Sequence, residues 1–225
     1  CLAAGVQLLY YEMPIAVRAA PGGWSVEAVG KGLRRTLTCR QLVDCTGDAD
    51  IVAMLGFARI RDAETQPGTL RFRFEGYDVD SLDAGEIETR YRQALADRTL
   101  QPGDVAHAGS PFIAFLRAGG ENAQHVLGAD SSTAATQTQA NIAGRRSVLR
   151  LLRFVRSLPG CERARLAAMA PETGVRETYR IDGEATVTAA DYVAGRRFPD
   201  AVCNAFYPVD VHTAALPDGA LRGQM

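Results

Sequence analysis

Short runs rich in apolar residues occupy the first third of the chain. Residues 15–19 and 24–29 are typical of strands, and in 33–39 apolar and polar residues alternate with the period of two that a strand has. Turn-forming sequences separate them, Pro-Gly-Gly at 21–23 and Lys-Gly at 31–32. The apolar run 41–45 then predicts one more, buried strand. We therefore expect a strand-rich meander that ends in a buried strand.

Helical patterns are more prominent in the rest of the chain. The longest helix is predicted over 133–158, where Val148, Leu152 and Val155 repeat on one side and Pro-Gly follows at 159–160. Shorter helices are predicted at 51–55, 85–96, 164–170 and 188–194, strands or extended segments at 70–74 and 174–184, and a mostly irregular stretch at 98–128.

Composition and charge argue against nucleic acid and membranes as partners of this chain. Of 225 residues, 47% are apolar, so the chain is long enough to bury a core. The 25 Lys and Arg nearly balance the 26 Asp and Glu, which leaves no overall field to attract nucleic acid or an anionic membrane. No apolar run approaches the roughly 20 residues that cross a bilayer. We predict a cytoplasmic protein that binds neither nucleic acid nor membrane.

The five cysteines are widely spaced and contain no Cys-x-x-Cys pair. Such spacing favours reduced, separately packed thiols over a disulfide framework or a metal site. The chain also opens on Cys1 and closes on a loop-like sequence, so we expect an internal piece of a longer protein.

The segment VDCTGDADIVAMLG is the first candidate for chemistry. A strand followed by a Thr46-Gly47 turn and a helix capped by Asp48 lets a ligand approach the backbone closely and offers it free N–H groups. A plain strand-to-helix turn is the alternative interpretation of the same residues.

The second candidate is GVRETYRIDGE. Arg176 and Arg180 fall on one side whether this segment is a strand or a helix, so their guanidinium groups could hold a carboxylate or stabilise a reduced flavin. Surface ion pairs with Glu177 and Glu184 are the alternative.

In the third candidate, YPVDVH, alternation places Asp210 and His212 on the same face. A carboxylate that orients an imidazole suits proton transfer, although a structural histidine is the alternative. Five arginines at 145, 146, 150, 153 and 156 could also bind an anionic partner, but they spread around the predicted helix.

Taken in order, QLVDCTGDADIVAMLGF, NIAGRRSVLRLLRFVRSLPG, PETGVRETYRIDGEATVTAADYVAGRRFPDAV and YPVDVH resemble the FAD-dependent oxidoreductase family of the glutathione-reductase-like flavoproteins. The resemblance implies an α/β, mixed α+β fold: part of a three-layer FAD-binding domain at 1–60, an inserted β-sheet and helix substrate domain at 61–200, and a return toward the FAD domain at 201–225.

The resemblance also implies site residues. Cys45, Thr46, Gly47 and Asp48 match the second dinucleotide-binding signature on the adenosine side of FAD, and Glu177 is assigned to cofactor binding with them. Arg176, Arg180, Asp210 and His212 are assigned to catalysis beside the flavin ring. The implied partner is a small-molecule substrate, for which an anionic one is an open option.

One motif of the family is not in this sequence. The family opens with Gly-x-Gly-x-x-Gly, whose backbone holds the FAD pyrophosphate, and no such run occurs here. We therefore expect an FAD-dependent oxidoreductase piece that is inactive by itself. Two alternatives stay open: a non-catalytic module that binds a partner through the arginines of 145–156, and a truncated product with a partly folded core.

Overall fold

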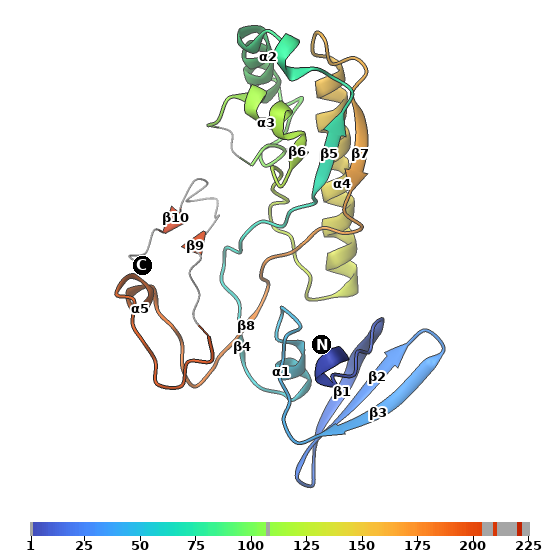
Figure 1. Ribbon diagram of the computed structural model, residues 1–225, viewed down its shortest axis with the longest axis vertical. Coiled ribbons are helices and arrows are strands. Elements are labelled where there is room, and N and C mark those ends of the chain that lie inside the picture. The colour runs from blue at the N-terminus through green and yellow to red at the C-terminus, as the bar shows by residue number, and fades with distance from the viewer. Residues whose placement is uncertain (1, 107–108, 204–208, 211–219, 222–225) are drawn as a thin grey trace. The chain divides into compact units, whose positions relative to one another are not determined.

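The computed structural model describes residues 2–106, 109–203, 209–210 and 220–221 (Figure 1). The chain forms two compact units, which we call the first unit (Cys1–Arg61 with Tyr179–Gly183) and the second unit (Asp62–Thr178 with Glu184–Met225). Both contain helices and small antiparallel sheets, so the predicted mixed α/β class is confirmed.

The first unit is built on a three-stranded antiparallel meander in the order β1-β2-β3. Its strands are β1 (Glu12–Ala20), β2 (Gly23–Gly30) and β3 (Leu33–Cys39), which confirms the three predicted strands. Gly22 and Gly32 have φ of 75° and 71°, a left-handed conformation that favours glycine in tight turns. A short 3₁₀ helix, η1 (Leu2–Ala4), precedes the meander.

Helix α1 (Asp50–Met54) packs on one face of this sheet. Ile51 forms the centre of a small core with Val17 and Val26, because Val17 and Val26 are cross-strand partners and lie on the same face. The unit also contains a two-stranded ribbon in which β4 (Arg59–Ile60) pairs with β8 (Arg180–Ile181).

The buried strand predicted at 41–45 is wrong. Within the part of the chain that the structure describes, this segment has no strand pairing, and Val43 is 79% exposed. A strand forms only where a neighbour satisfies its N–H and C=O groups, and an apolar run alone does not reveal that neighbour.

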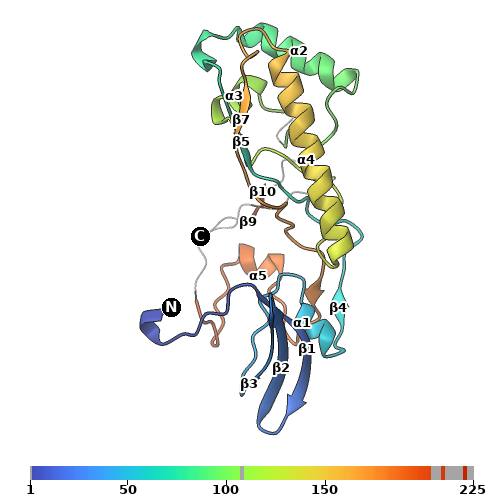
Figure 2. The same cartoon turned by 90° about the vertical axis from the view of Figure 1, so that its right-hand side faces the viewer.

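A small sheet and several helices form the main part of the second unit (Figures 1 and 2). The antiparallel sheet has the order β6-β5-β7, formed by β6 (Gly120–Glu121), β5 (Phe72–Glu75) and β7 (Arg165–Met169). The helices are α2 (Ala84–Ala96), α3 (Phe112–Ala118) and α4 (Ala134–Arg156), and both views show α4 alongside β5 and β7. The remaining elements are η2 (Val79–Ser81), α5 (Ala189–Val193), β9 (Val209–Asp210) and β10 (Ala220–Leu221).

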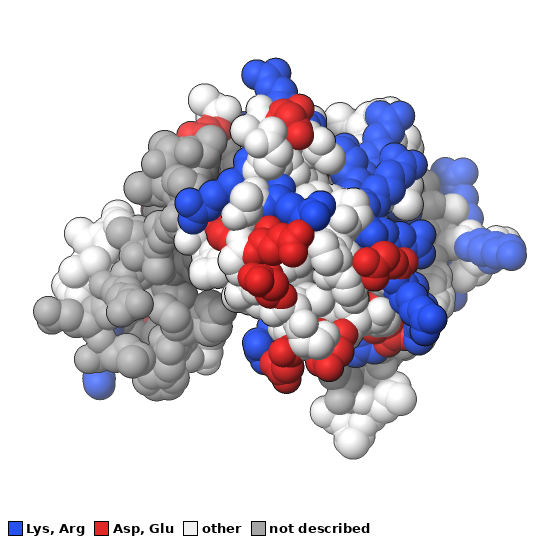
Figure 3. All heavy atoms as spheres, turned by 90° about the horizontal axis from the view of Figure 1, so that it is seen from above, with Lys and Arg blue, Asp and Glu red and all other residues white. Residues whose placement is uncertain are grey.

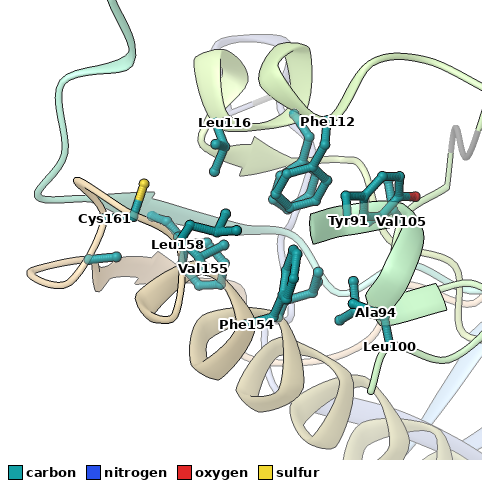
Figure 4. Packing of buried hydrophobic residues seen from close by; sticks show 14 of the residues in the cluster. Tyr91, Ala94, Leu100, Val105, Phe112, Leu116, Phe154, Val155, Leu158 and Cys161 are labelled. Atoms are coloured by element: carbon teal, nitrogen blue, oxygen red, sulfur yellow. The ribbon is translucent and has the colours of Figure 1, made fainter. Parts of the chain in front are cut away.

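Aromatic rings from three helices form the core of the second unit (Figure 4). Tyr91 of α2 stacks on Phe112 of α3 with ring centroids 4.6 Å apart, and Phe154 of α4 meets Phe112 edge-on at 5.3 Å. Leu151 and Val155 are fully buried beside them, which confirms part of the apolar stripe predicted for the long helix.

One prediction for the second unit is wrong. The segment 164–170 is not a helix but contains β7, because pairing with β5 overrides the helical propensity of its alanines. The stretch 98–128 is mostly irregular, as predicted, but it also contains the short elements α3 and β6. Predicted helices at 85–96, 133–158 and 188–194 are confirmed, and capping boxes at Thr133 and Thr188 begin the last two.

Charges of both signs are interspersed over the face shown in Figure 3. The ion pairs of the second unit include Arg90–Glu86 and Arg92–Glu88 on α2, and Arg117–Asp80. None of the helices in the described part of the chain is both long and apolar enough to cross a membrane.

Candidate functional site

The Cys45–Asp48 turn precedes α1 in the first unit and is stabilised from both sides by polar side chains. The Asp44 carboxylate accepts hydrogen bonds from the Thr46 backbone N–H at 3.0 Å, the Thr46 hydroxyl at 2.7 Å and the Val52 N–H at 3.1 Å. The Thr46 Oγ1 in turn accepts one from the Asp50 N–H at 2.9 Å. The start of the helix is therefore capped by residues that lie four to eight positions earlier.

The prediction that Asp48 caps this helix is wrong. The N-cap is Ala49, which has a left-handed φ of 55° and makes no side-chain capping bond. Asp48 is instead buried, with 6% of its surface exposed. Asp44 and Thr46 already supply the acceptors that the helix start needs.

Gly47 leaves the backbone of the turn open to a ligand. Its φ is 93°, and a Cβ at this position would have no atom within 4 Å. Cys45, Thr46 and Gly47 are all exposed. A polar ligand can therefore approach the peptide groups here without displacing a side chain.

Arg59 of β4 is hydrogen-bonded to the backbone of the same turn. Its Nη1 donates a hydrogen bond to the Asp48 carbonyl at 2.9 Å and lies 3.7 Å from the Asp50 carboxylate. Its guanidinium also lies over the Tyr179 ring, 4.0 Å from the centroid, while Arg61 approaches that ring at 5.3 Å. Sequence reasoning missed Arg59, since nothing in its local spacing points to the turn.

Asp50 and Asp44 have opposite electrostatic environments. Burial is the main reason that the pKa of Asp50 is raised, followed by the charge of Asp48, while Arg59 acts in the opposite direction. Burial also raises the pKa of Asp44, but hydrogen bonds from Thr46, Val52 and Ile51 outweigh burial, so that its pKa is lowered.

We predict that Asp44→Ala lowers the free energy of unfolding of the first unit by about 1 kcal/mol at neutral pH. Because the folded-state pKa of Asp44 is lowered, this stability is present above the unfolded pKa of about 4 and disappears as the pH falls through the folded value. Urea unfolding of the whole chain at several pH values, followed by fluorescence of Trp24, the single tryptophan of the sequence, measures it.

Asp182→Ala is the matched control for that measurement, because Asp182 is an exposed aspartate of the same unit. The control should unfold like the original chain. An Asp44→Ala deficit that persists unchanged in acid would contradict the capping role.

The predicted motif GVRETYRIDGE crosses from one unit to the other. Arg176 and Glu177 lie in the second unit, whereas Arg180 lies in β8 of the first. Both arginines are exposed. The convergence of their guanidinium groups stays a prediction.

Buried polar residues anchor the segment that carries Arg176. On one side of it, Thr69 and Gly174 exchange two backbone hydrogen bonds of 2.9 Å, and the Thr173 N–H donates to Asn141 Oδ1 at 2.8 Å. On the other side, the buried Thr178 Oγ1 accepts a hydrogen bond from the Ser131 N–H at 3.1 Å. The backbone on both sides of Arg176 is therefore fixed to the body of the second unit.

Glu177, which lies in the same segment, is hydrogen-bonded to a residue far away in the sequence. Its Oε2 accepts from Gln66 Nε2 at 3.3 Å. The partners Gln66, Asn141 and Ser131 were not predicted, because they are separated from the motif by more than 30 residues and no spacing rule connects them.

The third motif is only partly within the described residues. Asp210 lies in β9, where its backbone pairs with Ala220 of β10. His212 lies outside the described residues. The predicted Asp210–His212 pair therefore stays a prediction.

Most of the arginine-rich stretch of α4 contributes to the packing of the second unit. Arg150 makes two hydrogen bonds, of 2.6 and 3.0 Å, to the buried carboxylate of Asp104. Arg145 and Arg156 donate to the backbone carbonyls of Pro171 and Ala164. These contacts weaken the alternative in which the five arginines form a free partner-binding face.

The cysteines within the described residues form no disulfide. Cys39, Cys45, Cys161 and Cys203 are free thiols. Within the described ranges, no group of three or more His, Cys, Asp or Glu side chains is placed to hold a metal ion.

Comparison with known proteins identifies the family. The family model described as FAD dependent oxidoreductase matches residues 1–221, which is nearly the whole chain. The comparisons found no match among curated proteins or solved structures. The four sequence segments that resemble this family all lie within the matched range, and the Thr46–Gly47 turn is part of the first of them. The chain belongs to the FAD dependent oxidoreductase family.

Proposed function

We propose that the Cys45–Asp48 turn binds the adenosine side of FAD. The observation that carries this proposal is Gly47, whose left-handed backbone faces open space on a turn already fixed by Asp44, Thr46 and Arg59. These residues fit a polar cofactor, since they leave peptide groups accessible and need no rearrangement. The match to an FAD-dependent family over residues 1–221 supports the assignment.

The activity that we propose is transfer of hydride or electrons between a small organic substrate and FAD. Bound FAD supplies the redox chemistry, and the protein supplies position and charge. In this proposal Arg176 holds an anionic group of the substrate. Its guanidinium is exposed while the segment around it is fixed at Thr173 and Thr178, so little ordering is needed on binding.

We assign the other predicted residues to supporting roles. Glu177, held by Gln66, orients a polar group of the cofactor, and Arg180 stabilises the negative charge of the reduced flavin ring. Asp210 orients His212 for proton transfer. Each of these roles is an extension of the family resemblance. We also propose that this chain alone does not turn over and that the protein works in the cytoplasm, where its free cysteines stay reduced.

A ligand screen with a matched pair of variants tests the substrate side. The chain is mixed with FAD and with small mono- and dicarboxylic acids, and binding is followed by thermal shift. We expect at least one acid to stabilise the protein, with affinity reduced about tenfold in Arg176→Met, a loss of about 1.4 kcal/mol. Arg163→Met, which removes another exposed arginine of the second unit, should bind normally. Equal loss in both variants, or no stabilising acid, would refute the anionic-substrate proposal.

A further inference from the structure

Arg59 joins the cofactor turn to a residue that lies 120 positions later in the chain. The guanidinium donates to the Asp48 carbonyl at 2.9 Å and rests on the ring of Tyr179 at 4.0 Å. Its side chain is only 22% exposed. A cation held over an aromatic face and partly removed from water has few alternative positions.

The location of Tyr179 makes this contact informative. Tyr179 immediately follows Thr178 in the GVRETYRIDGE motif, and it precedes the two residues of β8 that pair with β4. Pairing of Ile60 with Arg180 and of Arg59 with Ile181 fixes the backbone next to both side chains. The pairing of β4 with β8 therefore places the ring of Tyr179 next to Arg59.

The contact between Arg59 and Tyr179 matters for the Cys45–Asp48 turn because Arg59 lies close to the acidic residues of that turn. Burial is the main cause of the raised pKa of Asp50, repulsion by the charge of Asp48 adds to it, and Arg59 is a cation that opposes this repulsion. If the guanidinium left this position, the Asp48 carbonyl would lose its donor and the repulsion would act on the backbone next to Gly47. A negatively charged cofactor would meet a less ordered and more acidic turn.

We propose that Arg59 and Tyr179 are a positioning pair that holds the backbone of the cofactor turn in its binding shape. The proposal rests on the proposed function of the turn in FAD binding. It gives the GVRETYRIDGE motif a second role, in which Tyr179 acts through Arg59 and touches neither cofactor nor substrate.

The test combines hydrogen exchange with FAD binding in the whole chain. Tyr179→Leu removes the aromatic face, Tyr179→Phe keeps it, and Tyr10→Leu removes another tyrosine of the first unit that is 75% exposed. Without FAD, we expect amide exchange in peptides covering 46–52 to be about tenfold faster in Tyr179→Leu and within twofold of the original chain in the other two. The dissociation constant for FAD, from flavin fluorescence, should rise about tenfold in Tyr179→Leu alone.

A second variant, which changes the other member of the pair, separates a local effect on the turn from global unfolding in Tyr179→Leu. Arg59→Met keeps the apolar stem but removes the donor to Asp48, and it should reproduce the exchange pattern of Tyr179→Leu. Unchanged exchange in both variants, or equal effects of Tyr179→Phe and Tyr179→Leu, would overturn the positioning pair. If the original chain binds no FAD while exchange still rises in Tyr179→Leu, the pair is supported as a brace of the turn and the proposed FAD function fails.

Discussion

Replacing Arg150 with methionine is expected to lower the free energy of unfolding of the second unit by about 3 kcal/mol. The Asp104 carboxylate is 2% exposed and accepts hydrogen bonds from the Arg150 guanidinium, the Ser147 hydroxyl and the Gln101 N–H. Removing the guanidinium leaves a buried charge without its cation, which costs more than the lost packing. Urea unfolding followed by the helical circular dichroism signal measures the change.

Two variants separate this explanation from a general effect on the helix. Arg153→Met removes an exposed arginine from the same helix and should change stability by less than about 0.5 kcal/mol. Adding Asp104→Asn to Arg150→Met removes the unpaired charge and should restore part of the lost stability. Equal effects of Arg150→Met and Arg153→Met would contradict the buried ion pair as the reason.

Replacing Gly47 with alanine is expected to weaken FAD binding by at least about tenfold. A side chain would occupy the open space above the turn, and an L residue at φ 93° would strain the backbone. Both effects act where the cofactor is proposed to approach. The dissociation constant for FAD, measured by fluorescence titration, reports the change.

Gly32→Ala is the matched control for this substitution. Gly32 lies in the turn between β2 and β3 with φ of 71°, and a Cβ there would also meet nothing within 4 Å. Both variants should therefore lose about 1 kcal/mol of stability, but only Gly47→Ala should lose affinity. An equal loss of affinity in both would show that strain, and not ligand contact, is responsible.

The elements that the sequence predicted well are those with local signals. The meander could be recognised because glycine turns separate three strand-like runs, and α4 and α5 because threonine capping boxes begin them. Helix α3 was missed since Pro111 and Gly119-Gly120, which bound it, suggested a loop. The strand β7 was missed because its partner, β5, lies about 90 residues earlier.

In the candidate site, too, local sequence signals predicted some features, and contacts between distant residues could not be predicted. The exposed turn at Thr46 and Gly47 could be predicted because glycine after an apolar run is a local signal for a tight turn, whereas its role in ligand binding stays a prediction. Asp44, whose carboxylate accepts a hydrogen bond from the Val52 N–H in the first turn of α1, was overlooked in favour of the nearer Asp48. Arg59, Tyr179 and Asn141 act through contacts between distant segments, and only the three-dimensional structure brings such residues together.

Whether FAD binds at the Cys45–Asp48 turn can be measured by fluorescence titration of the chain with FAD. We predict a saturable change in flavin fluorescence that ADP, which shares the adenosine side of the cofactor, reverses by competition. The change should require higher FAD concentrations in Gly47→Ala and not in Gly32→Ala. No saturable change, or a change that ADP leaves unaffected, would contradict the assignment of the Cys45–Asp48 turn to the adenosine side of FAD.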